Sequence, residues 1–286
     1  MTDFDYDFVV IGGGPAGRRA AIQASKLGKS VAIVDDQRMI GGVSVHTGTL
    51  PSKTIRESVL SLTGWRDQYF KSGRSRSSSD MTKTSINSRL ATTLGDEVEV
   101  IDSQLSRNNI AMLKGKAKFS GLNKLAVSQC VQGKTTSYSV TAEKFLIAVG
   151  TKPYRPKSIP FNGTTVVDSD SIAANLPIPK SIIVVGGGVI GLEYATIFST
   201  LEIPVTVIEA REKILEFIDH DIVANFTHQL FERGISLRLG KKIEKISLDD
   251  KGSPTVILDD GRQLKSEMLL FTAGRVGSVG KLGLEK

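Results

Sequence analysis

Short apolar, β-branched runs alternate along the chain with stretches of helical pattern, and two of these runs lead directly into glycine clusters. Residues 8–11 are Phe-Val-Val-Ile and stand before Gly12, and a helical pattern follows to about Lys26. A second apolar run at 30–34 then ends at Asp35. This order of strand, glycine turn, helix and strand predicts a βαβ unit.

The same order recurs in the second half of the chain. The apolar run 182–185 stands before Gly186, a helical pattern reaches about Leu201, and a further run at 205–208 ends at Glu209. In both halves, 18 positions separate the third glycine of the cluster from the acid. The chain is therefore predicted to contain two units of one design.

Both glycine clusters have the form Gly-x-Gly-x-x-Gly. The first glycine permits a tight turn, the second lets a pyrophosphate approach the backbone, and the third lets helix and strand pack closely. The helix that follows presents unpaired N–H groups to the phosphates. One such turn can be purely structural, but two with matched spacing to an acid favour dinucleotide binding, with each acid holding an adenosine ribose. The glycines are Gly12, Gly14 and Gly17 in the first turn and Gly186, Gly188 and Gly191 in the second.

Each half closes on an apolar run that ends in glycine, at 145–150 and at 269–274. Gly12 lies 138 positions before Gly150, whereas Gly186 lies only 88 before Gly274, so the first half holds 50 additional residues. We expect this insertion to carry what distinguishes the two sites.

The insertion has a mostly helical pattern. One helix is predicted from Pro51 to about Phe70 and a second from about Met81 to Asn109. The Ser/Arg-rich run between them, residues 71–79, is expected to be a solvated loop rather than an anion or nucleic-acid contact, because no aromatic residue interrupts it.

Composition narrows the class of protein further. The 286 residues are 40% hydrophobic, enough for a buried core, and their formal net charge of +7 is spread along the chain, so nucleic acid is not expected as a partner. Cys130 is the single cysteine, which excludes an intramolecular disulfide. No metal site is expected, because His220 and His228 share a predicted helix without an evident third ligand. The glycine-interrupted run 181–192 is too short to span a membrane.

A family resemblance is carried by residues 41–53, Gly-Gly-Val-Ser-Val-His-Thr-Gly-Thr-Leu-Pro-Ser-Lys. This phrase resembles the pyridine nucleotide-disulfide oxidoreductases, whose disulfide reductases place two cysteines in the positions held here by Ser44 and Thr49. It is most similar to the phrase of the soluble, Si-specific transhydrogenases of that family. Further matching phrases occur at 148–153, 191–193 and 272–275, and the similarity runs from about residue 5 to residue 286.

The resemblance implies an α/β fold with two Rossmann-like dinucleotide-binding domains, as in glutathione reductase. It implies an FAD-binding domain at 1–150 with the helical insertion at about 51–109, an NAD(P)-binding domain at 151–275, and the start of a returning segment at 276–286. FAD is expected near Gly12, Gly14, Gly17, Asp35, Gly42, Ser44, Lys53, Gly115 and Thr151. NAD(H) and NADP(H), the substrates, are expected near Gly186, Gly188, Ile190, Gly191, Glu209, Arg211 and Gly274.

The resemblance also implies the chemistry. Lys53 and Glu193 are expected to pair beside the flavin ring, where they would stabilise the charge that develops during hydride transfer. NADPH would reduce FAD, and NAD would then receive the hydride. A dihydrolipoamide dehydrogenase-like paralogue is the enzymatic alternative, disfavoured because the reduction of lipoamide needs both sulfurs.

If the enzyme accepts both dinucleotides, the carboxylate of Glu209 is expected to repel the 2′-phosphate of NADP(H). A carboxylate about 5 Å from a 2′-phosphate costs roughly 3 kcal/mol at an effective dielectric constant near 20. We expect Arg211 and Lys213 to offset this repulsion in the NADP(H) complex. His46 is expected to have a packing or hydrogen-bonding role in its turn.

The position of Lys286 leaves two further interpretations open. Full-length members of the resembled family continue beyond this point with the rest of the FAD domain and a dimerisation domain. The chain is therefore expected to be either a fragment of an active, cytoplasmic enzyme that forms a homodimer, or a truncated dinucleotide-binding remnant without catalysis. No secretory or transit signal is expected from the acidic first residues.

Overall fold

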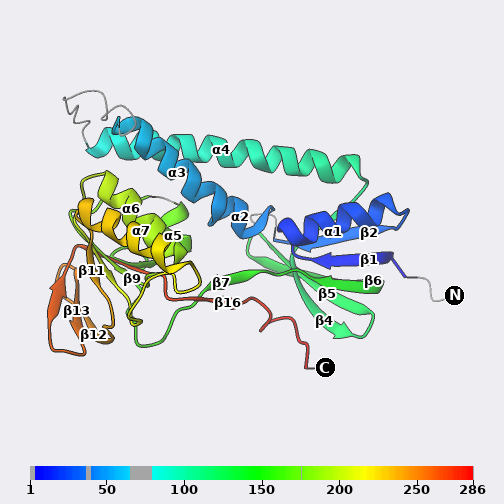
Figure 1. Cartoon of the computed structure of the whole chain (residues 1–286). Helices are drawn as coiled ribbons and strands as arrows, with labels where there is room; N and C mark the ends of the chain where they lie inside the picture. Colours follow the sequence, from blue (N-terminus) through cyan, green and yellow to red (C-terminus); the bar gives the residue numbers. More distant parts are fainter. Residues whose placement is uncertain (1–3, 37–39, 65–78, 175, 286) are drawn as a thin grey trace. The chain divides into compact units, whose positions relative to one another are not determined.

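The computed structural model describes residues 4–36, 40–64, 79–174 and 176–285 (Figure 1). Its helices in these ranges are α1 (Pro15–Lys26), α2 (Gly42–His46), α3 (Thr49–Leu62), α4 (Ser79–Arg107), α5 (Ser169–Ala174), α6 (Val189–Thr200) and α7 (His220–Glu232). The strands are β1 (Tyr6–Ile11), β2 (Val31–Asp35), β3 (Ala111–Lys114), β4 (Lys116–Gly121), β5 (Lys124–Val131), β6 (Lys134–Ile147), β7 (Thr151–Pro153), β8 (Val166–Asp168), β9 (Ile182–Val185), β10 (Val205–Ile208), β11 (Ser236–Arg238), β12 (Ile243–Leu248), β13 (Pro254–Leu258), β14 (Gln263–Lys265), β15 (Met268–Phe271) and β16 (Arg275–Gly277).

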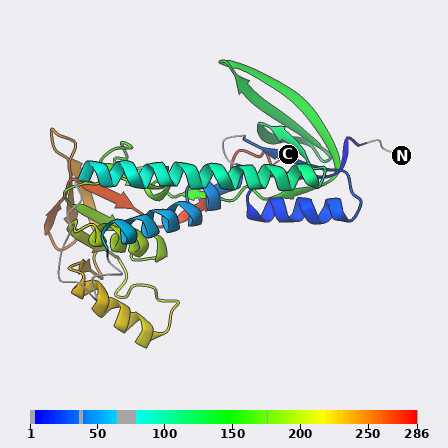
Figure 2. The same ribbon diagram turned by 90° about the horizontal axis from the view of Figure 1, so that it is seen from above.

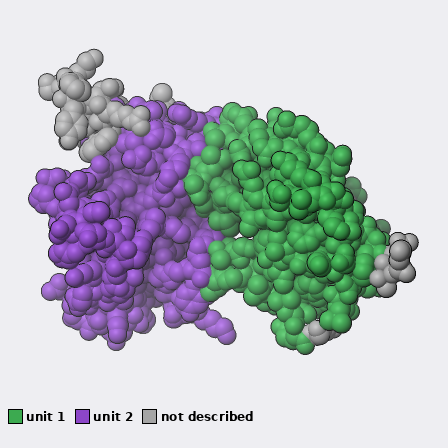
Figure 3. Space-filling view, turned by 45° about the vertical axis from the view of Figure 1, so that its right-hand side comes forward, with its two compact units in different colours: residues 1–50, 92–152, 276–286 green, residues 51–91, 153–275 purple. Residues whose placement is uncertain are grey.

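Two compact units divide the chain (Figure 3). The first comprises Met1–Leu50, Thr92–Lys152 and Val276–Lys286, and the second comprises Pro51–Ala91 and Pro153–Arg275. The resemblance implied a boundary near residue 150 and the start of a returning segment at 276–286, with the whole helical insertion in the first domain. The part of the insertion before Thr92 instead belongs to the second unit. Its described residues contact that unit, as when the Asn87 side-chain oxygen accepts from the Leu176 N–H at 3.2 Å.

A six-stranded sheet forms the first unit, in the order β3-β2-β1-β6-β5-β4. The strands β3, β2, β1 and β6 are parallel, whereas β6, β5 and β4 are antiparallel. Helix α1 lies along the sheet (Figure 1), and its Ala21 packs with Val10 and Ile33 in one buried cluster. The predicted βαβ order of strand, turn, helix and strand is confirmed here, with α1 ending at the expected Lys26.

Strand β6 is much longer than the run predicted at 145–150. It begins at Lys134 and ends at Ile147, with residues 134–141 paired to β5 and the remainder, 142–147, paired to β1. Figure 2 shows β5 and β6 as a long green ribbon. The exposed first half of β6 is rich in serine and threonine and lacks a buried face, which is why apolar alternation did not predict it.

In the second unit the central sheet is parallel, in the order β11-β10-β9-β15-β8. A separate antiparallel sheet, β12-β13-β14, packs its Val256 and Leu258 with Ile183 of β9. The second βαβ order, β9, α6 and β10, matches the expectation from the sequence. Both units therefore present the carboxyl ends of parallel strands to a helix N-terminus.

The two helices of the insertion are present as α3 and α4. Helix α3 ends at Leu62 and a turn follows at 63–64, where Gly64 has a φ of 61°, so the predicted continuation of this helix is wrong there. Residues 65–70 of the predicted extension, and residues 71–78 of the Ser/Arg run, lie outside the described residues. Within the described ranges, no helix combines the length and the apolar character needed to cross a bilayer, although α4 has 29 residues.

Close helix–strand packing explains the third glycine of each turn. A Cβ on Gly17 would lie 1.9 Å from the Gly12 carbonyl oxygen, and one on Gly191 would lie 2.0 Å from that of Gly186. Neither distance is possible for a real side chain. These glycines thus fix how closely α1 and α6 approach the strands before them.

The substitution Gly17→Ala is expected to lower the free energy of unfolding by about 3 kcal/mol, the upper part of the range for overpacking. Gly95→Ala is the control, because Gly95 lies in helix α4 with open space around its Cα. That control is expected to stabilise by about 1 kcal/mol through helix propensity. Urea unfolding of the two variants measures both values, and equal stability would contradict this account of the turn.

Candidate nucleotide-binding sites and the Lys53–Glu193 pair

A cavity of about 760 Å³ opens where the parallel strands of the second unit end. It lies where the strand order reverses, because the chain leaves β9 for β10 and β11 on one side and returns to β15 on the other side of β9. This is the usual ligand position in open α/β sheets. Of the residues predicted for this site, those lining the cavity are Gly186, Gly188, Ile190, Glu209, Arg211 and Gly274. Gly191 instead packs against Gly186, below the cavity.

The turn before α6 is shaped for a phosphate group. Gly186 has a φ of 111°, which favours glycine, and a Cβ there would meet the Thr272 hydroxyl at 2.9 Å. Gly188, at the N-cap of α6, has open space beside it, and no side chain caps the helix. The first N–H groups of α6 are therefore available to an anionic ligand.

Glu209 is buried at the end of β10, and both oxygens of its carboxylate accept hydrogen bonds from the protein. Oε1 accepts from the Arg211 backbone N–H at 3.0 Å and from Arg211 Nε at 2.9 Å. Oε2 accepts from the Gly187 N–H at 2.6 Å and from Arg211 Nη2 at 3.0 Å. Burial opposes ionisation, but the hydrogen bonds from Arg211 and Gly187 outweigh it and lower the pKa of Glu209 to about 2.

This arrangement revises the expected group of charges beside Glu209. Arg211 is bound to Glu209 through two nitrogens. Lys213 lines a different cavity, with Ile214 and His220, so it does not take the place that the sequence predicted for it. Lys241, Lys242 and Lys245 line the nucleotide cavity instead.

The sequence analysis missed these lysines, although a signal was available. The run Lys241-Lys242-Ile243-Glu244-Lys245 follows β11 closely, and β11 is the neighbour of β10 in the sheet. Loops that follow neighbouring parallel strands meet at the same edge of the sheet, so this run is expected to lie near Glu209. Recognising it required the strand order.

The first unit has a corresponding turn with a different acid. Gly12 has a φ of 107°, and a Cβ there would meet the Ala148 carbonyl oxygen at 2.4 Å. The Gly13 N–H donates to Asp35 Oδ2 at 2.5 Å. Burial raises the pKa of Asp35, opposed by that hydrogen bond. The turn geometry is shared with the second unit, but among the described residues no arginine side chain binds the Asp35 carboxylate as Arg211 binds that of Glu209.

The remaining residues predicted near a flavin are distributed through the first unit, apart from Lys53. Gly42 starts α2, and a Cβ there would lie 2.9 Å from the Gly14 Cα, so the two glycines form one open cradle. Ser44 donates to the Gly41 carbonyl at 2.9 Å, and the Gly115 N–H donates to the Asp35 carbonyl at 2.9 Å. Thr151 begins β7.

His46 contacts the backbone of its own segment. Its Nε2 lies 2.7 Å from the Ile40 carbonyl oxygen, which confirms the predicted hydrogen-bonding role. The neighbouring Thr47 hydroxyl is buried without a hydrogen-bond partner among the described residues. This segment of the first unit therefore contains an unsatisfied polar group of the kind that a bound cofactor can satisfy.

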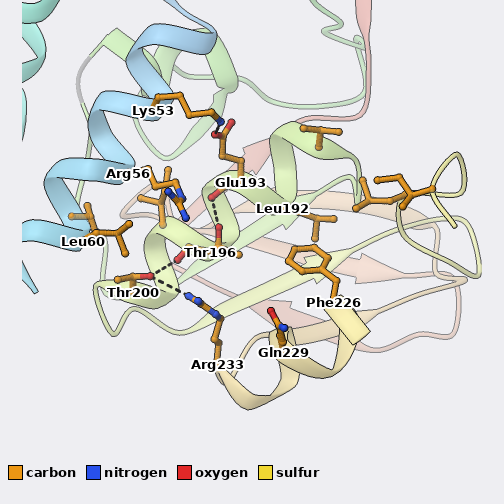
Figure 4. A pocket seen from close by; sticks show the side chains of 15 residues that line it. Lys53, Arg56, Leu60, Leu192, Glu193, Thr196, Thr200, Phe226, Gln229 and Arg233 are labelled. Atoms are coloured by element: carbon orange, nitrogen blue, oxygen red, sulfur yellow. Dashed lines mark hydrogen bonds and ion pairs between the residues drawn. The ribbon is translucent and has the colours of Figure 1, made fainter. Parts of the chain in front are cut away.

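Lys53 and Glu193 form an ion pair within the second unit, as Figure 4 shows. Lys53 extends from α3, and Glu193 comes from the first turns of α6. The pair lines a cavity of about 650 Å³ between α3, α6 and α7, in which Arg56 and Arg233 add two further cations. The structure thus brings together two residues that lie 140 positions apart in the sequence.

Comparison with protein families gives a match to the pyridine nucleotide-disulphide oxidoreductase model over residues 6–286. The chain is 39% identical over 280 residues to a soluble pyridine nucleotide transhydrogenase of Mycobacterium bovis, covering 98% of this chain and 59% of the relative. It is 37% identical over 287 residues to the protein of the same name from Chromohalobacter salexigens, covering 100% of this chain and 60% of the relative. The chain therefore spans about 60% of the length of these relatives.

Solved structures share the fold. LpdA from Mycobacterium tuberculosis superposes with a TM-score of 0.83 and 26% identity, covering 97% of this chain and 61% of that one. The Cu(II) complex of the HOCl-induced flavoprotein disulfide reductase RclA from Escherichia coli gives a TM-score of 0.81 and 26% identity, covering 98% and 59%. These neighbours support the predicted glutathione-reductase-like α/β fold.

The low pKa of Glu209 makes the free energy of unfolding depend on pH. Its folded value of about 2 lies below the ordinary 4.5, so the stabilisation is complete above pH 4.5 and is lost as the pH falls towards 2. The amount is at most about 3 kcal/mol. The stability difference between the wild type and Glu209→Gln should therefore shrink from pH 7 to pH 3, as measured by urea unfolding. Glu244→Gln, which removes an exposed carboxylate of the same cavity, controls for loss of a charge. A difference that stays constant over this range would contradict the assignment.

Proposed function

This chain belongs to the pyridine nucleotide-disulphide oxidoreductase family, and we propose that the protein transfers hydride between NADPH and NAD through a bound FAD. The reaction would be that of a Si-specific NAD(P)+ transhydrogenase. Relatives named as soluble pyridine nucleotide transhydrogenases support this choice within the family. The name "soluble" of those relatives also supports a cytoplasmic location, and we propose a homodimer for the full-length protein.

The first unit fits FAD on features of its own residues. The cradle of Gly14 and Gly42 leaves room for a pyrophosphate beside the uncapped N-terminus of α1. Asp35 lies at the end of β2, where its carboxylate can meet ribose hydroxyls. The buried Thr47 hydroxyl is a further group that a bound cofactor would satisfy.

The observation that carries the proposal is the Lys53–Glu193 pair in a chain with no sulfur at Ser44 or Thr49. A disulfide substrate needs a dithiol to exchange with, and Cys130 is the only cysteine. Lys53 and Glu193 are paired as the proposed hydride transfer would require, whereas the chain has no second cysteine for a disulfide relay. This disfavours a dihydrolipoamide dehydrogenase-like activity.

FAD, when bound, supplies a centre that accepts a hydride from one nicotinamide and passes it to another. The chain supplies position and charge. The turn at 186–191 would hold the pyrophosphate of the nicotinamide cofactor, and Glu209 and Arg211, which line the same cavity, would lie at its ribose end. Lys53 provides a positive charge that favours the reduced, anionic product of hydride transfer, and Glu193 fixes the ammonium in place.

Two measurements on the purified chain test this function. Retained flavin absorbance near its characteristic visible bands, together with NADPH-dependent reduction of a thio-NAD analogue, is the expected result. A colourless protein that binds dinucleotides without turnover would instead identify a non-catalytic dinucleotide-binding remnant. Oxidation of dihydrolipoamide above background would favour the paralogue.

Lys53→Ala is expected to slow reduction of the flavin by NADPH about 10²- to 10³-fold, because one preorganised charge is removed from the transition state. The Kd for NADPH should change far less. Stopped-flow absorbance measures the rate and titration calorimetry the affinity. Arg56→Ala is the matched control, since Arg56 also extends from α3 into the same cavity but pairs with its exposed neighbour Glu57 at 3.2 Å. Equal reduction rates in wild type and Lys53→Ala would remove the role assigned to Lys53.

A further inference from the structure

We infer that Lys242 is the residue that selects the 2′-phosphate of NADP(H) in the second unit, while the Arg211 guanidinium stays bound to Glu209. This inference rests on the proposed function, because it concerns the ribose end of the same nucleotide cavity. Lys242 lines that cavity together with Glu209 and Arg211.

The backbone places Lys242 directly beside Glu209. The N–H of Lys241 donates to the Glu209 carbonyl at 3.1 Å, and the N–H of Gly240 donates to the Arg211 carbonyl at 2.9 Å. These two bonds join the loop after β11 to the loop after β10. Lys242 directly follows the residue that is bound to the Glu209 backbone. It therefore lies next to the place where the ribose is expected.

A second set of bonds fixes the backbone of Lys242 itself. Its N–H donates to Asp259 Oδ2 at 3.2 Å, and its carbonyl accepts from the Asp259 N–H at 3.0 Å. The residue is exposed, and no ion pair joins its ammonium to an acid in the part of the chain that the structure describes. Lys242 thus has a fixed backbone and a cation available for a ligand.

Arg211 is poorly suited to this task because its guanidinium neutralises a buried carboxylate. Glu209 is 6% exposed and uses both oxygens to bind Arg211. Withdrawing the guanidinium towards a phosphate would leave that carboxylate with only backbone donors, beside a second anion. We therefore expect the Glu209–Arg211 ion pair to stay intact. Its two opposite charges then cancel, so Arg211 does not attract the phosphate.

The other lysines of the cavity are less suitable. Lys241 lies 3.0 Å from Asp260, so its charge is already paired. Lys245 is three residues further along the chain, about 10 Å in a strand. Glu244 lines the cavity as well, but no ion pair links it to Lys242 within the described ranges.

The substitution Lys242→Met should therefore weaken the binding of NADP+ but not that of NAD+. Titration calorimetry is expected to show a roughly tenfold higher Kd for NADP+, the loss of one charge-assisted hydrogen bond, and less than a twofold change for NAD+. The dependence of the NADP+ affinity on salt should weaken as well. Lys242→Arg should keep the preference, because it keeps the cation.

Lys213→Met is the matched control, since it removes an exposed lysine of the second unit that lines another cavity. It should leave both affinities unchanged. An NADP+ affinity that changes less than twofold in Lys242→Met, or an equal loss for both dinucleotides, would overturn the inference while leaving the proposed function in place. Wild-type protein that binds neither dinucleotide would overturn both.

Discussion

Both glycine turns depend on one contact that contains no side chain. Gly17 and Gly191 each face the carbonyl oxygen of the first glycine of their turn so closely that a Cβ would lie about 2 Å from it. This approach sets the first N–H groups of α1 and α6 over the ends of β1 and β9. Each sheet then adds an acid from the neighbouring strand, Asp35 or Glu209, at the same edge. The position of the phosphates and of the ribose therefore follows from backbone packing.

The two acids have the same place in the fold but opposite electrostatics. Burial raises the pKa of Asp35, whose side chain is held by the Gly13 N–H. Burial acts on Glu209 too, but the guanidinium and backbone donors of Arg211 reverse its effect and lower the pKa to about 2. The difference comes from a residue outside the repeated motif. Two copies of one turn can thus serve different ligands without any change in the glycines.

Much of the local structure could be predicted from the chain, because glycine turns and apolar runs are short-range signals. The ends of α1 and β2 and the strand β9 followed from them. The long strand β6 did not, since its Ser/Thr-rich half packs against no core and shows no alternation. The Lys241–Lys242 run was missed for another reason. Its relation to Glu209 depends on β11 lying beside β10, and strand order is set by contacts between distant residues. Lys213 was chosen because it is close in sequence, but it lines another cavity.

A site that accepts two dinucleotides differing by one phosphate has to meet two opposed electrostatic demands. A bare carboxylate at the ribose suits hydroxyl groups and repels a phosphate, and a bare cation does the reverse. In the proposed function, the paired Glu209 and Arg211 would remove most of this conflict, because together they present little net charge to the cavity. In our proposal, the preference between NADP(H) and NAD(H) then depends on Lys242, a cation that lines the cavity and is screened by solvent. Such a group contributes a modest preference, which a transhydrogenase needs, since strong selection for either dinucleotide would stop it from exchanging them.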